Sequence, residues 1–503
     1  MSDILTNWSK LPRWFWPLLI GLNFLLHAPF FSQPPVGLHT WRQSNTMAVI
    51  RNFYEEDMNI MRPRVDRRNE SDGVTGMQFP SYEWTVAAVC KAVGFHEGVA
   101  RVVNWLIFAG GVIFCYHLFR RITQSVWMAA VAAWCLSWSP ELFYHCISAL
   151  PDVLALSASL GGLWLFLRWW DTRHSLSFWG SLLLTTLAGA TKLQFLLIGF
   201  PIAGLVVQAL LSRQFDWRRS LLPLFFFAVV SVGLPLAWYA YSLRLIETSG
   251  LADFGLEVRP ADDLRTGLGI LLFNIKSDWP EMLLGYGSAV MVLVGAGQMR
   301  LAGVRRSPWM WPALLWVGGV AVYYVFELRQ MKDHGYYMLP LLPLFVWAAA
   351  KGSEVLRRNV RWHWLLALIL FSQPVWAGVR VMKYWLRGPR DVPSEMYYPQ
   401  SRALLENAVP NDALCLVGPD ESGCKQFYFV HKKGFGLESS ERLSWPTTTG
   451  EPYVADCIAR GAQYLYLSDS TLLTNPYLAP YVGPRVVRVG AVQVFKLQMP
   501  AGR

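Results

Sequence analysis

The segment LPRWFWPLLIGLNFLLHAPFFSQPPVGLHTWRQSN, residues 11–45, decides the fold class. Its first part is an apolar run of the length that a membrane-spanning helix needs, about 20 residues. The run lacks the small-residue cleavage site of a removed signal peptide. Two prolines close it, and the cluster HTWRQ follows almost at once. A plain anchor would continue into an ordinary polar loop, so this cluster at a membrane edge indicates a functional role.

The composition of the whole chain agrees with a membrane protein. Of 503 residues, 53% are hydrophobic and 16% are charged, whereas a soluble protein carries about 25% charged residues. The mean hydropathy is +0.28, and the 25 tryptophans fit a protein with many lipid–water boundaries. The net charge of +11 lies mostly in short clusters between apolar segments. This placement indicates topology signals and argues against nucleic acid as a partner.

Eleven segments qualify, or nearly qualify, as membrane helices, and three of them are short. If eleven helices alternate in direction, the basic clusters of six loops all fall on one side, which the positive-inside rule assigns to the cytoplasm. The sequence therefore predicts a polytopic α-helical membrane protein with about eleven spans. The segments are 13–32, 99–118, 126–139, 150–169, 175–190, 193–211, 220–242, 282–299, 308–327, 336–350 and 362–382.

The opposite, outer side then receives a long first loop, residues 33–84, and the tail. The tail contains the β-like runs ALCLVG, QFYFV, YLYLS and AVQVFKL, together with segments of helical spacing. We predict a membrane domain over residues 1–389 and a small α/β domain outside the membrane over residues 390–503. Within the first loop, SNTMAVIRNFYEED and the stretch after Pro80 are expected to form two amphipathic helices at the membrane surface.

The first outer loop holds the first candidate site residues. His39 and Arg42 lie within one helical turn of each other, beside Trp41 and Gln43, and a guanidinium offers a planar fork that suits a phosphate. The alternative is that Arg42 snorkels to lipid headgroups. A His and a Gln have no reason to snorkel, so we favour function. Asp66, in RPRVDRRNE, should stay ionised among its arginines, although a solvated loop charge is the simpler interpretation.

Two further charges lie at the ends of apolar segments. Asp152 in ALPDVLAL begins an apolar helix from the outer side, where its charge complements the helix dipole. Capping is therefore the simpler role and binding is the alternative. Lys192 stands in LAGATKLQFLLIGFP with nothing else charged nearby. A lysine in this place costs energy unless it reaches water or an anion, so snorkelling and anion binding are both open.

The turn ELRQMKDHGYYMLPLLP, which begins at residue 327, places five ionisable groups within eight residues at a helix mouth on the outer side. We predict that this turn is an anion-binding lip; a merely solvated loop is the alternative. The ionisable residues are Glu327, Arg329, Lys332, Asp333 and His334, and Tyr336 begins the aromatic pair that follows them.

The sequence offers no pattern for a metal. No spaced Asp-x-Asp pair occurs in an outer loop, and the seven cysteines show neither a CxxC pair nor a Cys/His metal spacing. We therefore predict no catalytic metal. Cys415, Cys424 and Cys457 share the tail, and an oxidising compartment would permit one disulfide among them.

The motifs FPSYEWTVAAVCKAVGFHEGVARVVN, ALPDVLAL, LAGATKLQFLLIGFP and HGYYMLPLLP, in this order, resemble the membrane-embedded GT-C glycosyltransferases. The likeness is strongest to bacterial aminoarabinose transferases and protein O-mannosyltransferases, and it covers residues 10–350 or so. It implies transfer of a hexose or pentose from a polyprenyl-phosphate sugar, the lipid-linked co-substrate, to a cell-envelope glycan, lipopolysaccharide or protein. It also implies a bacterial inner (plasma) membrane, with the active site and the tail domain on the periplasmic side, and no tightly bound cofactor.

One departure from the family pattern bears on the catalytic base. The family usually has an acidic residue just after the first anchor; alignment on Arg42 puts His39 there, and the family's Lys-Pro-Pro-like element reads QFP, residues 78–80. We expect the base to be His39, Asp66, or a hydrogen-bonded pair of the two. The donor phosphate would be neutralised by Arg42, Lys192, and Arg329 or Lys332. The rest of the pocket would be Trp41, Gln43, Asp152, Asp333, His334 and Tyr336.

Other functions fit the sequence less well. A transporter or flippase of lipid-linked sugars would place its polar residues near the bilayer midplane, in broken helices of repeated halves. Here they gather at the outer mouth, and no repeat is visible. A non-catalytic assembly subunit would leave Lys192 and residues 327–334 without a role. A polymerase of lipid-linked repeats remains open, because pocket shape, which the sequence does not reveal, selects the sugar and the acceptor.

Overall fold

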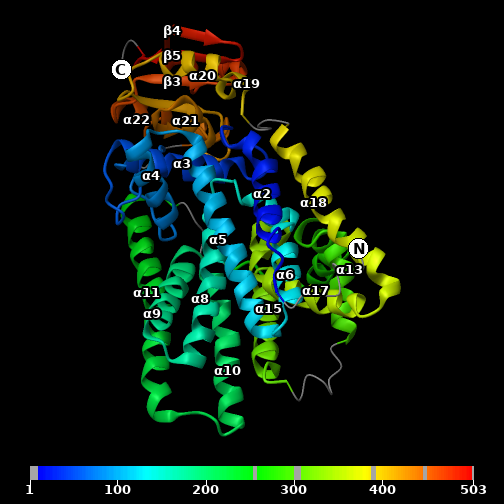
Figure 1. Ribbon diagram of the computed structural model, residues 1–503. Coiled ribbons are helices and arrows are strands. Elements are labelled where there is room, and N and C mark those ends of the chain that lie inside the picture. Colours follow the sequence, from blue (N-terminus) through cyan, green and yellow to red (C-terminus); the bar gives the residue numbers. More distant parts are fainter. Residues whose placement is uncertain (1–9, 253–257, 299–306, 387–391, 446–449, 501–503) are drawn as a thin grey trace. The chain divides into compact units, whose positions relative to one another are not determined.

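The computed structural model describes residues 10–252, 258–298, 307–386, 392–445 and 450–500. The chain forms two compact units, each built from separate stretches of sequence (Figure 1). Unit 1 comprises Met1–Phe31, Arg101–Tyr239 and Leu256–Lys383. Unit 2 comprises Ser32–Ala100, Ala240–Gly255 and Tyr384–Arg503. The first outer loop and the tail thus share one unit, and the boundary predicted at residues 389 and 390 stays a prediction.

Unit 1 contains the helices of the membrane part, three of which, α5, α11 and α18, extend at one end into residues of unit 2. Their bounds are α2 (Phe15–His27), α5 (Glu97–Thr123), α6 (Val126–Ser137), α7 (Pro140–His145), α8 (Asp152–Thr172), α9 (Ser175–Thr191), α10 (Gly199–Leu211), α11 (Trp217–Ser249), α12 (Leu264–Phe273), α13 (Tyr286–Gln298), α15 (Met310–Phe326), α16 (Leu328–Asp333), α17 (Leu342–Arg357) and α18 (His363–Leu386). Short helical turns link them, η1 (Ala28–Phe30), η2 (Leu193–Ile198), η3 (Asn274–Leu283), η4 (Gly335–Leu341) and η5 (Val360–Trp362).

A helix occupies most of each of the eleven predicted segments, but fewer of them are long enough to span a bilayer. Within the described ranges, six helices are long and apolar enough, and a seventh is counted if the bent pair Leu264–Leu283 and Tyr286–Gly297 is one span. The protein is therefore a membrane protein with six or seven candidate spans, and the count of eleven is not confirmed. Helices such as Val126–Ser137, with 12 residues, cover less than the hydrocarbon thickness of about 30 Å at 1.5 Å per residue.

Helices α8 and α9 form an antiparallel pair that positions the central charges of unit 1. They pack closely along their lengths. At Gly162 the helices approach so closely that a Cβ atom would meet the Thr185 side chain, and Ser181 donates a hydrogen bond to the Gly162 carbonyl at 2.7 Å. Asp152 is the first residue of α8, and Lys192 directly follows α9. The two ends of this hairpin therefore bring Asp152 and Lys192 together.

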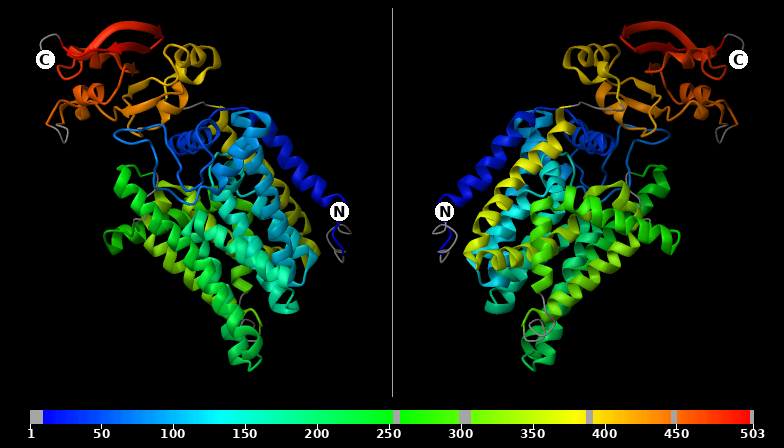
Figure 2. Two further views of the ribbon diagram at one scale, coloured as in Figure 1. Left: turned by 90° about the vertical axis from the view of Figure 1, so that its left-hand side faces the viewer. Right: turned by 90° about the vertical axis from the view of Figure 1, so that its right-hand side faces the viewer.

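Unit 2 contains a five-stranded mixed sheet with the order β2-β1-β3-β5-β4. The strands are β1 (Leu414–Gly418), β2 (Lys433–Gly436), β3 (Tyr464–Leu467), β4 (Val482–Val489) and β5 (Val492–Leu497), and Figure 2 shows the long β4–β5 hairpin in red. Strand β1 runs parallel to β2 and β3, while β5 is antiparallel to β3 and β4. Leu416, Phe435 and Leu465 stand in register across the first three strands and enter the hydrophobic core.

Short helices connect and cover these strands, and one of them corrects a sequence prediction. The run QFYFV, expected to be β-like, forms α21 (Lys425–Val430) instead. A short apolar run does not distinguish a strand from a buried helix, and the parallel pair β1–β2 requires a crossover between its strands. The other helices here are α19 (Ser394–Tyr397), α20 (Pro399–Glu406), α22 (Tyr453–Ala459) and the turns η6 (Glu441–Ser444), η7 (Ser470–Thr474) and η8 (Ala479–Tyr481).

The first outer loop forms the two predicted helices, α3 (Thr40–Glu55) and α4 (Ser81–Val93). The prediction that α3 lies on the membrane surface is wrong. Thirteen of its sixteen residues are buried, on polar and apolar faces alike, and it packs against α4 and α21. Its mixed polar and apolar sequence reflects a buried polar network rather than an interface. Helix α4 does expose apolar side chains, among them Trp84 and Val93.

Candidate functional site

The HTWRQ cluster forms a fixed entry to α3. His39 precedes the helix with φ of 54°, in the left-handed region, where histidine occurs more often than most residues. The Gln43 side-chain nitrogen donates hydrogen bonds to the carbonyl oxygens of Val36 and Leu38, at 3.0 and 2.9 Å. Gln43 thus ties the preceding loop to the helix and holds His39 at its start.

Arg42 is buried and is the first of three polar side chains that are joined by hydrogen bonds. Its Nη2 donates to Gln78 Oε1 at 2.7 Å, and Gln78 Nε2 donates to Glu83 Oε1 at 3.3 Å. All three side chains belong to buried residues, and the guanidinium also lies 6.0 Å from the Trp41 ring centroid. The snorkelling alternative for Arg42 is therefore wrong. Gln78 and Glu83 were not singled out from the sequence beyond the QFP element, since only the fold shows that this element faces Arg42.

Asp66 belongs to a closed buried ion pair. Its Oδ2 lies 2.7 Å from Arg51 Nη2, with both side chains 2% exposed, and its Oδ1 accepts from Asn52 Nδ2 at 3.1 Å. Arg51 in turn donates to the Tyr428 carbonyl oxygen at 3.1 Å and packs over the Tyr428 ring. Both carboxylate oxygens are thus occupied. The structure does not join Asp66 to His39, so the predicted hydrogen-bonded pair is absent among the described contacts.

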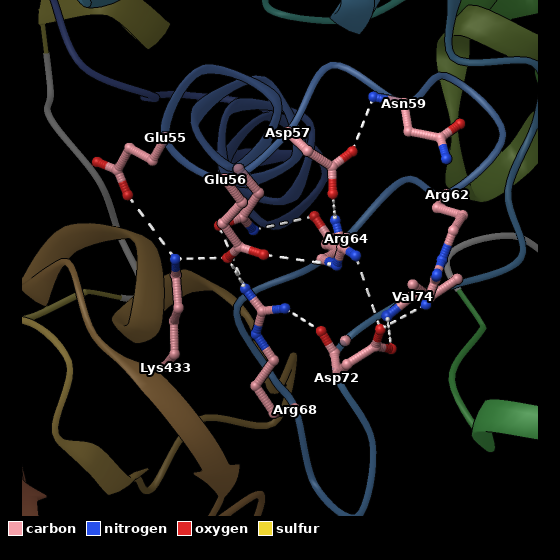
Figure 3. A network of polar contacts seen from close by, with 12 residues as sticks. Glu55, Glu56, Asp57, Asn59, Arg62, Arg64, Arg68, Asp72, Val74 and Lys433 are labelled. Carbon is pink, nitrogen blue, oxygen red and sulfur yellow. Dashed lines mark hydrogen bonds and ion pairs between the residues drawn. The ribbon is translucent and has the colours of Figure 1, made fainter.

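The arginines next to Asp66 in sequence have other partners. Figure 3 shows the network around them, in which Lys433 Nζ donates to Glu56 at 2.6 Å and Arg62 donates to Asp72 at 2.8 Å. Partial burial acts to raise the pKa of Asp57. The hydrogen bond from Arg64 is the largest of the interactions that bring this pKa below its ordinary value. This network ties the loop to α3 and to the sheet, which is a structural role. The remaining pairs are Arg68 with Glu56, Arg64 with Glu56 and Asp72, and Arg67 with Glu438.

In unit 1, Lys192 lies among polar and aromatic side chains. Its Nζ is 3.4 Å from Asp152 Oδ1, with the side chains 12% and 1% exposed. It also lies 5.2 and 5.4 Å from the ring centroids of Tyr336 and Tyr337, distances at which an ammonium is attracted to a ring. Within the described part of the chain, neither Lys192 Nζ nor Asp152 Oδ1 makes a hydrogen bond. Lys192 is a nearly buried cation with unused donors.

The Tyr336 side of this site includes two residues that the sequence reading missed. Glu141 Oε1 and His145 Nε2 are 3.0 Å apart, both buried, and the His145 ring meets the edge of Tyr336 at 5.7 Å. The His334 ring stacks on Tyr336, with centroids 5.5 Å apart. The signal that could have revealed the pair is the Glu-x-x-x-His spacing in PELFYHC, which puts both residues on one helix face.

The predicted lip, residues 327–334, divides into two groups. His334 stacks on Tyr336, which lies next to Lys192. Glu327 is near enough to Lys192 for the positive charge to act on its carboxyl group. Burial raises the pKa of Glu327, against the charges of Arg259 and Lys192. Arg329, by contrast, is exposed and pairs with Asp262, and Lys332 and Asp333 are exposed as well. The structure brings none of these last three into contact with Lys192.

The described residues contain no group of three or more metal-ligating side chains. All seven cysteines, including Cys415, Cys424 and Cys457, are free thiols, and Cys424 alone among them is not buried.

Comparisons with known proteins agree with this architecture. The family model described as dolichyl-phosphate-mannose-protein mannosyltransferase matches residues 78–239. The crystal structure of ArnT from Cupriavidus metallidurans in the apo state is similar at a TM-score of 0.66 and 15% identity, over 96% of this chain and 97% of that one. The same protein bound to undecaprenyl phosphate is similar at a TM-score of 0.67 and 14% identity, over 96% and 98% of the two chains.

Larger enzymes share the fold as well. The archaeal oligosaccharyltransferase AglB from Archaeoglobus fulgidus matches at a TM-score of 0.59 and 10% identity, over 95% of this chain and 73% of that one. The arabinofuranosyltransferase AftD from Mycobacteria matches at 0.57 and 13% identity, over 97% and 40%. No curated protein matches the sequence. The chain has the fold of the GT-C glycosyltransferases, so the resemblance predicted from the ordered motifs is confirmed.

Proposed function

We propose that this protein is a GT-C glycosyltransferase that moves a sugar from a polyprenyl-phosphate donor to an acceptor outside the cytoplasm. The observation that carries the proposal is Lys192, a nearly buried ammonium with unused donors beside two adjacent tyrosine rings. It lies in a chain whose fold resembles that of ArnT, a protein whose structure includes bound undecaprenyl phosphate.

Lys192 would stabilise the leaving phosphate. When the glycosidic bond to the donor breaks, negative charge grows on the phosphate oxygen, and a cation in a largely water-excluded site stabilises that charge strongly. Asp152, at 3.4 Å, would hold the ammonium in place while leaving its donors available. The aromatic rings would exclude water and form a wall of the pocket. That Arg42 is a further phosphate ligand stays a prediction from the sequence; within unit 2 its Nη2 donates to Gln78 Oε1.

His39 would be the general base. Of the two candidates, Asp66 already uses both carboxylate oxygens in contacts with Arg51 and Asn52, whereas an imidazole titrates near neutral pH and can accept a proton there. The acceptor hydroxyl attacks the anomeric carbon as its proton passes to His39. The carbon–oxygen bond to the phosphate breaks, polyprenyl phosphate leaves, and the anomeric configuration inverts in a single displacement.

The proposed setting is a bacterial inner membrane with the site on the periplasmic side. The transferred sugar would be a hexose or a pentose, and the acceptor a cell-envelope glycan, lipopolysaccharide or protein. A transporter of lipid-linked sugars is not favoured, because transport gives the Lys192 site no bond to break and the similar folds belong to transferases.

The experiment incubates purified protein with a panel of polyprenyl-phosphate hexoses and pentoses and measures the release of free polyprenyl phosphate in the presence of a cell-envelope extract. We expect one donor class to be consumed, and His39→Asn and Lys192→Met each to suppress the release. Movement of an intact lipid-linked sugar across a liposome membrane, without release, would instead establish the transporter.

A further inference from the structure

A cavity of about 240 Å³ lies within unit 2, and none of its lining residues has a role in the mechanism above. Its walls come from the start of α3, from the first outer loop and from the loop that follows β1. Its polar and aromatic lining residues are Trp41, Asn45, Arg67, Thr75, Ser422 and Cys424.

Asn45 is the feature that points to a ligand. The residue is 8% exposed, it lines the cavity, and its side-chain amide makes no hydrogen bond within the described residues. The amide atoms are not among the fully buried, unpartnered side-chain atoms, so they reach the open space of the cavity, and asparagine is a poor residue for the interior of a helix. A ligand that accepts from and donates to this amide would give it the partners that the protein does not supply.

The remaining groups define the chemistry of that ligand. Arg67 is neutralised by Glu438, 2.5 Å away, so the cavity offers no spare positive charge for a phosphate or a carboxylate. Ser422 Oγ donates to Asp420 at 2.6 Å and Thr75 Oγ1 donates to the Leu251 carbonyl oxygen at 3.2 Å. Ser422 Oγ also accepts from the backbone N–H groups of Cys424 and Lys425, so the hydroxyl that can still accept is that of Thr75. This acceptor and the Asn45 amide suit a neutral, hydroxyl-bearing molecule.

The size and lining of the cavity restrict the class of ligand further. Sites for drug-sized ligands measure about 300–1,000 Å³, so a cavity of about 240 Å³ suits a single ring. The Trp41 indole contributes an aromatic surface, against which the apolar face of a sugar can pack. Trp41 is also the chain neighbour of Arg42, and Asn45 lies one helical turn further along α3.

We propose that this cavity is a subsite for one neutral sugar ring of the acceptor. The assignment rests on the proposed transfer reaction, and it names the acceptor as a saccharide rather than a peptide hydroxyl. Asn45 and Trp41 are its specificity-determining residues, and the bound ring lies beside the stretch of α3 that carries Arg42.

Cys424 provides a readout that needs no donor and no transfer. It lines the cavity and is the one cysteine of the seven that is not buried, so a maleimide should label the folded full-length protein there, and Cys424→Ser should abolish the labelling. We expect methyl glycosides of neutral hexoses or pentoses to slow the labelling, while glycerol and inorganic phosphate do not. Protection by phosphate alone, or by none of these compounds, would overturn the proposal.

Variants of Asn45 then separate binding from folding. Asn45→Leu should weaken protection by the glycoside, and raise the KM for the acceptor but not for the donor, by about tenfold. The melting temperature should not fall, because the amide has no protein partner to lose. Asn407→Leu, on an exposed helix end, is the matched control and should change neither quantity.

The outcomes also distinguish this inference from the transfer proposal. If a glycoside protects Cys424 from labelling but no donor releases polyprenyl phosphate, the sugar subsite stands and the transferase proposal is refuted. If Asn45→Leu leaves transfer unchanged, or raises only the KM for the donor, the acceptor subsite is refuted and the transferase proposal stands.

Discussion

Each unit of the molecule contains a buried pair of opposite charges, and the two pairs are built differently. In unit 2, Asp66 and Arg51 are 2.7 Å apart and equally buried, and neighbouring groups occupy both carboxylate oxygens. In unit 1, Lys192 and Asp152 are 3.4 Å apart, and neither of the facing atoms makes a hydrogen bond among the described residues. In the first pair the carboxylate is fully bonded and the unbonded buried atom is Arg51 Nε, whereas in the second pair the two facing atoms themselves retain binding capacity.

The contrast separates charges that stabilise the fold from charges that are available for chemistry. Buried ions need partners, and the Asp66 carboxylate, with both oxygens bonded to Arg51 and Asn52, already has the partners that it needs. An incomplete pair is unfavourable for the fold alone and becomes favourable when an anion enters. For Asp66 the sequence predicted a carboxylate kept ionised by the arginines that flank it, or a solvated loop charge, yet these arginines pair with other carboxylates and Asp66 is buried.

The largest expected effect is on catalysis, at Lys192. Lys192→Met should lower the rate of polyprenyl phosphate release at least about 100-fold, as the loss of one charge-stabilising group typically does. The variant also leaves the buried Asp152 carboxylate without its counterion, so its melting temperature should fall as well, and the release rate is compared per folded molecule. Lys332→Met is the matched control, since Lys332 is exposed, and should retain most activity. An equal loss of activity in both variants would show that Lys192 contributes no more to the reaction than the exposed Lys332.

At Asp66 we expect an effect on stability and not on catalysis. Asp66→Asn leaves the Arg51 charge without its buried counterion, which should lower the free energy of unfolding by about 3–5 kcal/mol, measured by chemical denaturation in detergent. The activity of the molecules that remain folded should be largely retained. A variant of wild-type stability with no transfer would instead identify Asp66 as the catalytic base, in place of His39.

The aromatic wall of the Lys192 site gives an intermediate effect. Tyr336→Leu removes a ring 5.2 Å from the ammonium, which should cost about 0.5–2 kcal/mol of transition-state stabilisation, read as a fall in kcat/KM. Tyr336→Phe keeps the ring and should behave like the wild type. If the Phe variant fails as badly as the Leu variant, the hydroxyl rather than the ring is the functional group.

The smallest effect concerns pH and the surface of unit 2. Burial raises the pKa of Glu55, but the hydrogen bond to His431, 2.8 Å away, and the charges of His431, Arg51 and Lys433 together bring the pKa below its ordinary value. The folded state therefore gains stability from Glu55 above the unfolded pKa and loses it as the pH falls through the lower folded pKa. Glu55→Gln should remove this part of acid sensitivity, worth about 0–1 kcal/mol for a partly exposed pair. Melting temperatures between neutral and acid pH test it.

The sequence predicted the helical segments well and the spans less well. Hydropathy locates apolar stretches, but helix length and bending depend on packing, as at α6, which ends after 12 residues. In the tail, the strands with clear apolar runs, such as β3 and β5, were recognisable. Strand β2, with the sequence KGFG, has no periodic signal, and it was missed because its pairing with β1 is decided by tertiary structure.

The candidate site was predictable residue by residue, but not in its pairing. The sequence singled out Lys192 and Asp152 as unusual charges at the ends of apolar segments and Tyr336 as the start of an aromatic pair, and the α8–α9 hairpin explains why Lys192 and Asp152 meet. Asn45 lacked such a signal, because an asparagine in a polar helix is common in sequence, and the Glu-x-x-x-His spacing of Glu141 and His145 is a weak one. Their importance depends on burial and on which hydrogen bonds remain unmade, and a sequence records neither.

The most direct test of the central claim is the affinity of purified protein for undecaprenyl phosphate, compared among the wild type, Lys192→Met and Lys332→Met by native mass spectrometry. If the incomplete Lys192–Asp152 pair binds the phosphate, the affinity should fall at least about tenfold in Lys192→Met and stay unchanged in Lys332→Met. Equal affinity in the wild type and Lys192→Met would contradict the account.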